Sequence, residues 1–154
     1  MTPALVQRAF ERVPLPESEL VVQPPGGQTL VNLETIFSTE AEGFTETVTL
    51  LGRSVELDIT PSSYGWRHGD SSEQTTDWPG QEWRRGRGAH RYVTHTYDDR
   101  MRVSTRVDTT WSARYRVGSG PWQDVPGTVT IEGQPTALRV RSASPHLVGA
   151  ADPG

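Results

Sequence analysis

The 154-residue sequence contains no cysteine and no lysine, and it has a single asparagine, Asn32. The absence of cysteine excludes disulfide bonds, thiolate nucleophiles and cysteine-ligated zinc or iron–sulfur centres. All 15 basic residues are arginine. Codon bias in a GC-rich genome explains this usage, and selection of arginine for bidentate contacts is the alternative.

Long hydrophobic runs are also missing. No apolar run approaches the roughly 18 residues of a membrane span, and no signal-peptide core lies near the N-terminus. A chain trimmed after a signal peptide would look the same. The net charge of −4 is too small to indicate polyanion binding by the whole chain. The length suits one domain, and its Val, Ile, Leu and aromatic residues exclude a disordered chain.

The N-terminal segment predicts a short helix. Thr2 can cap it, Pro3 suits the first helical position, and Pro14 ends it. Residues 14–27 are rich in proline and predict an extended linker. The apolar residues of the helix form one stripe that must pack on another element: Leu5, Val6, Ala9, Phe10 and Val13.

From residue 29 onwards the hydrophobic period changes to two, which indicates strands. Gly52-Arg53 lies between two alternating runs and suits a type II′ hairpin turn. The predicted strands are 29–37, 45–51, 54–60, 63–68, 91–97, 101–117, 127–133 and 136–143.

The strongest signal covers residues 101–117, where every odd position is apolar or threonine and every even position is polar or charged. Such alternation indicates a strand with one wet face. Its 17 residues would extend roughly 56 Å, longer than the diameter of about 40 Å expected of a compact domain of this size. The strand must therefore bend, bulge or cross between sheets, or project as an arm.

These strands and the single helix predict an all-β fold, an Ig-like antiparallel β-sandwich of about seven or eight strands with a short N-terminal helix. We divide the chain into residues 1–27, the helix and Pro-rich lead-in, residues 28–144, the sandwich, and residues 145–154, a C-terminal tail.

One stretch carries a family resemblance. The sequence "YGWRHGDSS" (64–72), followed by "VTHTY" (93–97), resembles the polycystic-kidney-disease (PKD) type of Ig-like domain. That family has a Trp-x-Phe-Gly-Asp-Gly strand and turn with a later His-x-Tyr. The stretches "QPPGGQTLVNLETIF", "TVTLLG" and "WRHGD" look like those of secreted actinobacterial PKD-like proteins.

The resemblance implies structural roles for its residues. Trp66 would fill the core, Asp70 would brace the turn after Gly69, and His95 and Tyr97 would lock the opposing strand. Two positions depart from the pattern, because His68 replaces a phenylalanine and Ser71 replaces the second glycine. A buried His68 needs a hydrogen-bond partner, which Asp70 or a backbone carbonyl could supply.

The sequence gives weaker support for a catalytic site or a metal site at these residues than for structural roles. His68 and Asp70 could form half of a metal site with His95, but a fourth ligand is missing. Ser62 or Ser63 could join His95 and Asp70, yet no nucleophile elbow surrounds either serine. The Gly-Arg-Gly run at 86–88 lacks a P-loop lysine and a following helix. We therefore expect neither an enzyme nor a cofactor.

The stretch 71–90 exceeds what a scaffold needs, and long loops in compact domains are often functional. Indole and guanidinium groups can bind sugars, carboxylates or proteins. The alternative is that the indoles fold back as a satellite core while the arginines stay solvated. The candidate ligand or partner residues in this loop are Trp78, Trp83, Arg84, Arg85, Arg87 and His90.

A second aromatic group lies on and beside the long strand. Trp111, Tyr115 and Trp122 are core residues if the strand bends into the domain. If the strand projects, they form an exposed stripe for a partner chain.

The sequence thus favours a non-catalytic structural or protein-interaction module, a spacer or adhesion domain outside the cell or in its envelope. Its partner would be a protein or a glycan. The alternatives are a carbohydrate-binding module that uses the 71–90 loop and a structural subunit of a larger assembly. Nucleic acid is disfavoured, because the chain is net acidic and lacks an aromatic sheet platform.

Overall fold

The computed structural model describes residues 1–84 and 92–142. It is an all-β, sandwich-like fold with one N-terminal helix, as the sequence predicts, and its sheets contain three and eight strands. In chain order its elements are α1 (Pro3–Arg12), β1 (Val21–Gln23), β2 (Gln28–Leu30), β3 (Glu34–Ser38), β4 (Phe44–Leu50), β5 (Arg53–Arg67), β6 (Glu73–Thr76), β7 (Val93–Thr96), β8 (Met101–Val117), β9 (Gln123–Asp124), β10 (Val129–Ile131) and β11 (Thr136–Arg141).

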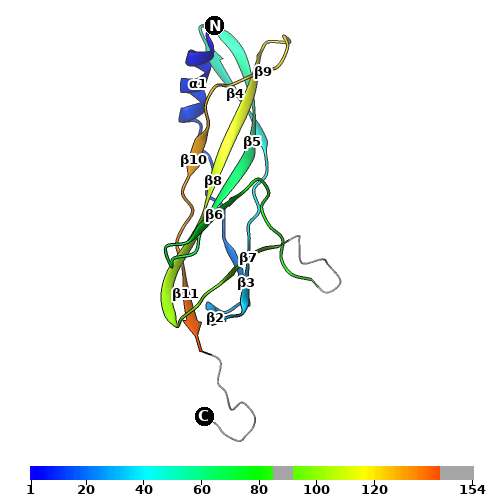
Figure 1. Cartoon of the computed structure of the whole chain (residues 1–154). Helices are drawn as coiled ribbons and strands as arrows, with labels where there is room; N and C mark the ends of the chain where they lie inside the picture. The colour runs from blue at the N-terminus through cyan, green and yellow to red at the C-terminus, as the bar shows by residue number, and fades with distance from the viewer. Residues whose placement is uncertain (85–91, 143–154) are drawn as a thin grey trace, which may run out of the picture.

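The molecule is a rod built around two long antiparallel strands, β5 and β8 (Figure 1). Their ladder runs from Val55 opposite Val117 to Arg67 opposite Arg106. Strands β4 and β6 continue the sheet beyond β5, while β9, β10 and β11 pair with β8. The predicted strand 101–117 is confirmed with these bounds. It follows the rod's long axis and does not project as an arm.

A bulge in β5 keeps its apolar side chains on one face. The register with β8 shifts between Pro61 and Ser63. Before the bulge, odd positions such as Ile59 are buried, and after it, even positions such as Trp66 are buried. One extra residue on a bulged strand reverses which parity faces the core. The stretches 54–60 and 63–68, predicted as two strands, are therefore one strand.

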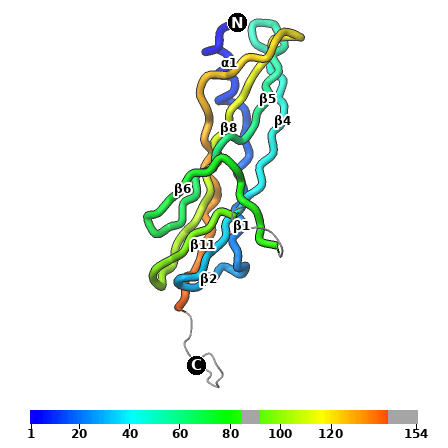
Figure 2. The backbone as a smooth tube through the Cα atoms, turned by 45° about the vertical axis from the view of Figure 1, so that its right-hand side comes forward, coloured from blue at the N-terminus to red at the C-terminus, as the bar shows by residue number. Residues whose placement is uncertain are grey.

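Different elements cover the two halves of this apolar face. At one end α1 packs Val6 and Phe10 into a cluster with Leu57 and Trp111. At the other end the small sheet β1-β3-β7 supplies Phe37 and Val93 to a second cluster. Figure 2 shows α1 near the N-terminal end of the rod, and β1 and β2 near the other end. The helix thus takes the place of the second sheet at one end of the sandwich.

The predicted helix is confirmed, and its capping is as expected. The Thr2 hydroxyl accepts a hydrogen bond from the Leu5 amide at 3.3 Å, and Pro3 occupies the first helical position. The buried stripe is narrower than predicted, because Val6 and Phe10 are buried while Leu5 and Ala9 are only half-buried. Leu5 and Ala9 instead line an open groove of about 490 Å³ between α1 and β4.

Two local predictions were wrong. The predicted strand 29–37 is two strands, β2 and β3, because the chain turns at Asn32, whose φ is 64°. The β4–β5 hairpin turns at Leu51-Gly52 and not at Gly52-Arg53, since Leu50 pairs with Arg53. Leu51 and Gly52 both have positive φ (51° and 73°), which is the geometry of a type I′ turn and not type II′.

The segment predicted as a linker takes part in the fold. Val21–Gln23 of the 14–27 stretch form β1, which pairs with β3. The Ser18 hydroxyl, also in this stretch, is buried 2.6 Å from the Thr109 hydroxyl. One strand pair departs from the antiparallel pattern, because β2 runs parallel to β11. Within residues 1–84 and 92–142 no helix is long and apolar enough to cross a membrane.

Candidate functional site

The turn that follows β5 gathers the residues that carry the family resemblance. Trp66, near the end of β5, is buried in the cluster beneath the small sheet. Its indole Nε1 donates a hydrogen bond of 2.9 Å to the Thr76 hydroxyl, which in turn donates to the Trp78 carbonyl at 2.7 Å. The polar edge of the indole is therefore satisfied by β6, the strand that pairs with this part of β5.

Backbone geometry explains the glycine in the turn. Gly69 has φ of 86°, and a Cβ placed there would lie 2.6 Å from Val103 Cβ and 2.8 Å from the Ser104 carbonyl oxygen. No other residue fits this close approach without displacing β8. Ser71, which replaces the second glycine of the PKD pattern, adopts a left-handed φ of 72°. The turn thus keeps a glycine-like conformation at a serine, at a cost in backbone strain.

Asp70 closes the turn as a hydrogen-bond acceptor. Its Oδ1 accepts from the Ser72 amide at 3.1 Å and also from the Ser72 hydroxyl. Its Oδ2 lies 2.7 Å from Nε2 of His95 on β7. Asp70 therefore braces the turn and ties it to the small sheet, as Asp commonly does in Asx turns.

Two stacked histidines lie beneath this turn. The rings of His68 and His95 are parallel within 2°, with centroids 4.1 Å apart. Phe37 packs against the other side of His68 at 4.7 Å. His68 Nε2 is 2.9 Å from the Gln74 side-chain oxygen, whereas its buried Nδ1 has no partner among the described residues. His68 is thus held in an aromatic stack with one of its two nitrogens satisfied.

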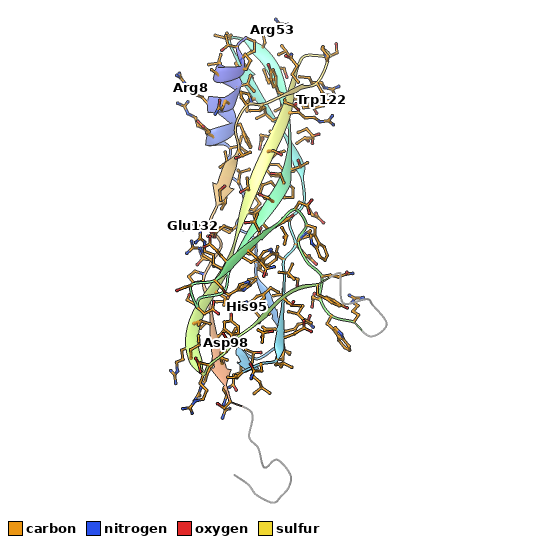
Figure 3. The ribbon with its side chains drawn as sticks, in the orientation of Figure 1. Arg8, Arg53, His95, Asp98, Trp122 and Glu132 are labelled. Atoms are coloured by element: carbon orange, nitrogen blue, oxygen red, sulfur yellow. The ribbon has the colours of Figure 1, made fainter. Side chains whose placement is uncertain are left out.

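Tyr97 joins β7 to the end of β5. Its hydroxyl donates a hydrogen bond of 2.7 Å to the His68 carbonyl, and its side chain is fully buried. The His95 ring meets the Tyr97 ring edge-on at 4.6 Å. Figure 3 shows His95 within the lower part of the rod, near the strands of the small sheet. Tyr97 and His95 together hold the small sheet against the turn.

The electrostatics of the cluster favour an ionised Asp70 and a neutral His68. Burial acts to raise the pKa of Asp70, but hydrogen bonds from Ser72 and His95 outweigh it and lower this pKa to about 2. Burial lowers the pKa of His68; the Gln74 hydrogen bond opposes this effect, and the neighbouring His95 adds to it. Burial also raises the pKa of the Tyr97 hydroxyl well above its ordinary value.

This geometry does not form a catalytic relay. Both Ser72 Oγ and Asp70 Oδ2 contact Nε2 of His95, at 3.2 and 2.7 Å. A Ser-His-Asp relay needs the acid and the serine on opposite ring nitrogens. Ser62, one of the serines considered from sequence, donates to the Thr110 carbonyl at 3.1 Å.

The cluster is equally unsuited to a metal ion. Because the His68 and His95 rings stack face to face, their in-plane lone pairs cannot converge on one point. Over the described residues, no group of three or more His, Asp or Glu side chains is arranged to hold an ion. The arrangement acts chemically as a set of structural hydrogen bonds.

The candidate loop 71–90 divides into separate parts. Residues Glu73–Thr76 of the loop form β6, and Trp78 packs, half-buried, against the core cluster beneath the small sheet. Trp83 is 52% exposed, and its amide donates a hydrogen bond of 2.6 Å to the Gln23 side chain. Arg84 is exposed. Arg85, Arg87 and His90 lie outside the described residues, so one exposed indole remains of the pair expected to bind sugar.

The second aromatic group belongs mainly to the core. Trp111 and Tyr115 are buried in the cluster beneath α1. Trp122 is half-buried near the top of the rod in Figure 3, with the guanidinium groups of Arg114 and Arg116 4.8 and 4.7 Å from its ring centre. Its indole thus packs on cations from the same chain.

Sequence reasoning missed the residues that complete the cluster. Gln74 and Thr76, on β6, provide the partners of His68 and Trp66. The run Glu73–Thr76 contains no apolar residue, so it gives no signal of period two. A buried His68 and Trp66 on one strand would have indicated that a neighbouring strand must supply polar partners.

The fold is that of a sandwich-like all-β protein, and the polar cluster joins its small sheet to the turn after β5. In the comparisons with known proteins, no protein-family model, curated protein or solved structure matches the chain.

Proposed function

We propose that the protein is a non-catalytic spacer or adhesion module of the PKD-like type, acting outside the cell or in its envelope. The observation that carries this proposal is the β5–β8 ladder, which runs along most of the rod with a single bulge. Strand β11 continues the pairing along β8 to the lower end. Strand β8 alone extends roughly 56 Å at the usual rise per residue. A spacer requires such a rigid separation of its two ends.

Two further features support the proposal. The β4–β5 turn and the end of β11 lie at opposite ends of the rod (Figure 1), so segments attached at these ends would be held apart. The polar cluster around Asp70 is occupied in bracing the turn. The burial of Trp66 and the hydrogen bonds accepted by Asp70 support structural roles for these two residues.

The test measures the separation of the ends directly. Since the chain has no cysteine, Arg53→Cys and Ser142→Cys can be introduced together and carry spin labels at defined positions. We expect a single narrow distance distribution centred at roughly 60 Å, because the two labels lie beyond opposite ends of β8. Pulsed electron–electron double resonance between the two spin labels gives this distribution.

Arg53→Cys with Glu132→Cys provides a matched pair across the upper half of the rod alone. This pair should give a distance clearly shorter than the first, with a similar width. A broad distribution for the long pair beside a narrow one for the short pair would mean that the rod hinges between its two clusters. A hinged rod would contradict a rigid spacer.

A further inference from the structure

The outward, wet face of the long sheet is charge-balanced over most of its length. Arg114 bonds Asp58 at 2.8 Å, and Arg116 bonds Glu56 at 2.8 Å. Towards the other end, Arg67 and Arg106 share the buried carboxylate of Asp108. Each of these four guanidinium groups thus has a carboxylate partner, either on the paired strand or on its own strand.

This balance ends at the lower tip of the rod. Four arginines line one depression of about 390 Å³ there: Arg100, Arg102, Arg139 and Arg141. All four are exposed, and none of the described residues that line the depression is a carboxylate, although Asp98 and Asp99 directly precede Arg100 in the chain. None of the ion pairs formed within residues 1–84 and 92–142 involves any of them.

Strand register makes this arrangement a compact grid. Arg102 on β8 lies directly opposite Arg139 on β11. The same register continued beyond Val140 and Met101 sets Arg141 opposite Arg100. Opposed positions of an antiparallel pair lie about 5 Å apart, and alternate positions along a strand about 7 Å apart. The four guanidinium groups thus form a two-by-two array on one face.

Like charges directly opposite each other destabilise a sheet. Among the described residues, the side chains of these four arginines make one hydrogen bond, from Arg141 Nη1 to the Gln28 side-chain oxygen at 3.1 Å. Guanidinium forks match sulfate, phosphate and carboxylate groups in bidentate geometry. We propose that Arg100, Arg102, Arg139 and Arg141 form a binding site for a linear anionic glycan bearing such oxyanions.

The lining of the depression favours an anionic glycan over two other classes of ligand. No Trp, Tyr or Phe lines it in the part of the chain that the structure describes, whereas single-stranded nucleic acids bind largely by stacking on aromatic side chains. Its apolar lining is limited to Met101 and Val140, too little for the apolar centre of a protein interface. A sugar polymer with oxyanions spaced several ångströms apart needs neither feature. The site is separate from the Asp70 turn and goes beyond the spacer role.

The experiment compares two double variants that remove the same charge. Arg102→Gln/Arg139→Gln deletes the opposed pair in the grid. Arg114→Gln/Arg116→Gln deletes two arginines from the same wet face of β8, at positions paired with acids. Binding is measured by calorimetry with heparin fragments as the sulfated chain and oligogalacturonate as the carboxylate chain. Neutral dextran and single-stranded oligothymidylate serve as comparison probes.

We expect the wild type and Arg114→Gln/Arg116→Gln to bind at least one acidic glycan, and neither to bind dextran. Arg102→Gln/Arg139→Gln should lose affinity by roughly tenfold or more, since two charge-assisted contacts are removed. Its melting temperature should equal or exceed that of the wild type, because the variant relieves the opposed like charges. The melting measurement separates lost binding from lost folding.

Four results would overturn the proposal. The wild type could fail to bind either acidic glycan, or the grid variant could bind as tightly as the wild type. The Arg114→Gln/Arg116→Gln variant could lose as much affinity as the grid variant, which would indicate non-specific charge attraction. Oligothymidylate could bind as tightly as the acidic glycans, which would make the ligand class wrong. A preference for the sulfated or the carboxylate chain, with the grid variant weakened, supports the site and identifies its oxyanion.

Discussion

At the scale of single residues, His68 is the most unusual choice in the core. Its ring lies between Phe37 and His95, at a position where the PKD pattern has phenylalanine. One nitrogen faces Gln74 on β6, and the other is buried without a partner among the described residues. Because burial lowers the pKa of His68, the folded state resists a proton that the unfolded chain accepts.

This difference makes stability depend on pH. The unfolded histidine titrates near 6.5, so the unfolded state binds more protons than the folded state below that value. The free energy of unfolding must then fall as the pH decreases through 6.5. The neighbouring titratable groups are His95 on β7 and Asp70 in the turn, and the Asp70 pKa of about 2 keeps Asp70 ionised throughout this range.

His68→Phe should reduce this pH dependence. We expect the wild type to lose stability between about pH 7.5 and pH 5.5, and the variant to lose less over the same interval. At pH 7.5 the two should differ by about 1 kcal/mol or less, since the variant removes an unsatisfied nitrogen but strands Gln74. Urea denaturation at several pH values measures the difference.

Gln74→Met is the matched control for this prediction. It removes the polar partner of His68 but leaves the imidazole in place, so the pH dependence should persist. Equal slopes for the wild type and His68→Phe would mean that other groups cause the acid sensitivity.

At the scale of elements, the bulge in β5 decides which side chains reach the core. The register with β8 shifts between Pro61 and Ser63, so that Tyr64 and Trp66 lie on the same face as Leu57 and Ile59. Ser62 itself is exposed, and its hydroxyl bonds the Thr110 carbonyl. The presence of a residue at this position therefore matters more than its side chain.

Deleting Ser62 should be far more damaging than replacing it. The deletion removes the extra residue, so a straight ladder would turn Tyr64 and Trp66 towards solvent. Losing their burial costs roughly 4 kcal/mol or more, at about 2–3 kcal/mol for each large side chain. Thermal unfolding followed by tryptophan fluorescence should show a strongly lowered or absent transition.

Ser62→Ala keeps the chain length and should change stability by less than about 1 kcal/mol. Deleting Ser119 in the β8–β9 turn tests whether any deletion is equally harmful, and we expect a smaller effect there. A Ser62 deletion as mild as Ser62→Ala would show that the bulge does not set the register.

An element can be predicted from the sequence when its residue pattern is long or includes residues at fixed positions. Helix α1 and strand β8 are predictable, because one has a cap and a proline at fixed positions and the other alternates over 17 residues. Strands β1 and β6 have three and four residues, and β6 has no apolar position, so their pairing partners alone define them. The β5 bulge adds one residue, and its one compositional signal is Pro61, because a proline inside a central strand is found at bulges.

The same distinction applies to the candidate sites. The turn-bracing role of Asp70 can be predicted from the sequence, because its partner Ser72 lies two residues away. The arginine grid cannot, because Arg102 and Arg139 are far apart in sequence and meet only through the β8–β11 register. The whole-chain charge of −4 conceals it as well.

At the scale of the whole molecule, two core clusters share a single ladder. The cluster beneath α1 contains Leu57 and Trp111, and the cluster beneath the small sheet contains Trp66 and Val107. Each cluster thus takes residues from both β5 and β8. Strands β5 and β8 cannot separate at one end without releasing the core residues of that end, so both clusters depend on the same ladder. We infer that loss of one cluster weakens this ladder and, through it, the other cluster.

Phe10→Ala tests this coupling. Phe10 is buried in the cluster beneath α1, and its truncation to alanine should lower the free energy of unfolding by about 3–5 kcal/mol. If the rod unfolds as one unit, hydrogen exchange should accelerate by the same factor in residues 55–59 and in residues 64–67 of β5. Leu5→Ala, at a half-buried position of the same helix, should produce the same uniform pattern with a smaller amplitude. Faster exchange confined to residues 55–59 would mean that the cluster beneath α1 opens by itself. The rod would then consist of two units that unfold independently although one strand pair joins them.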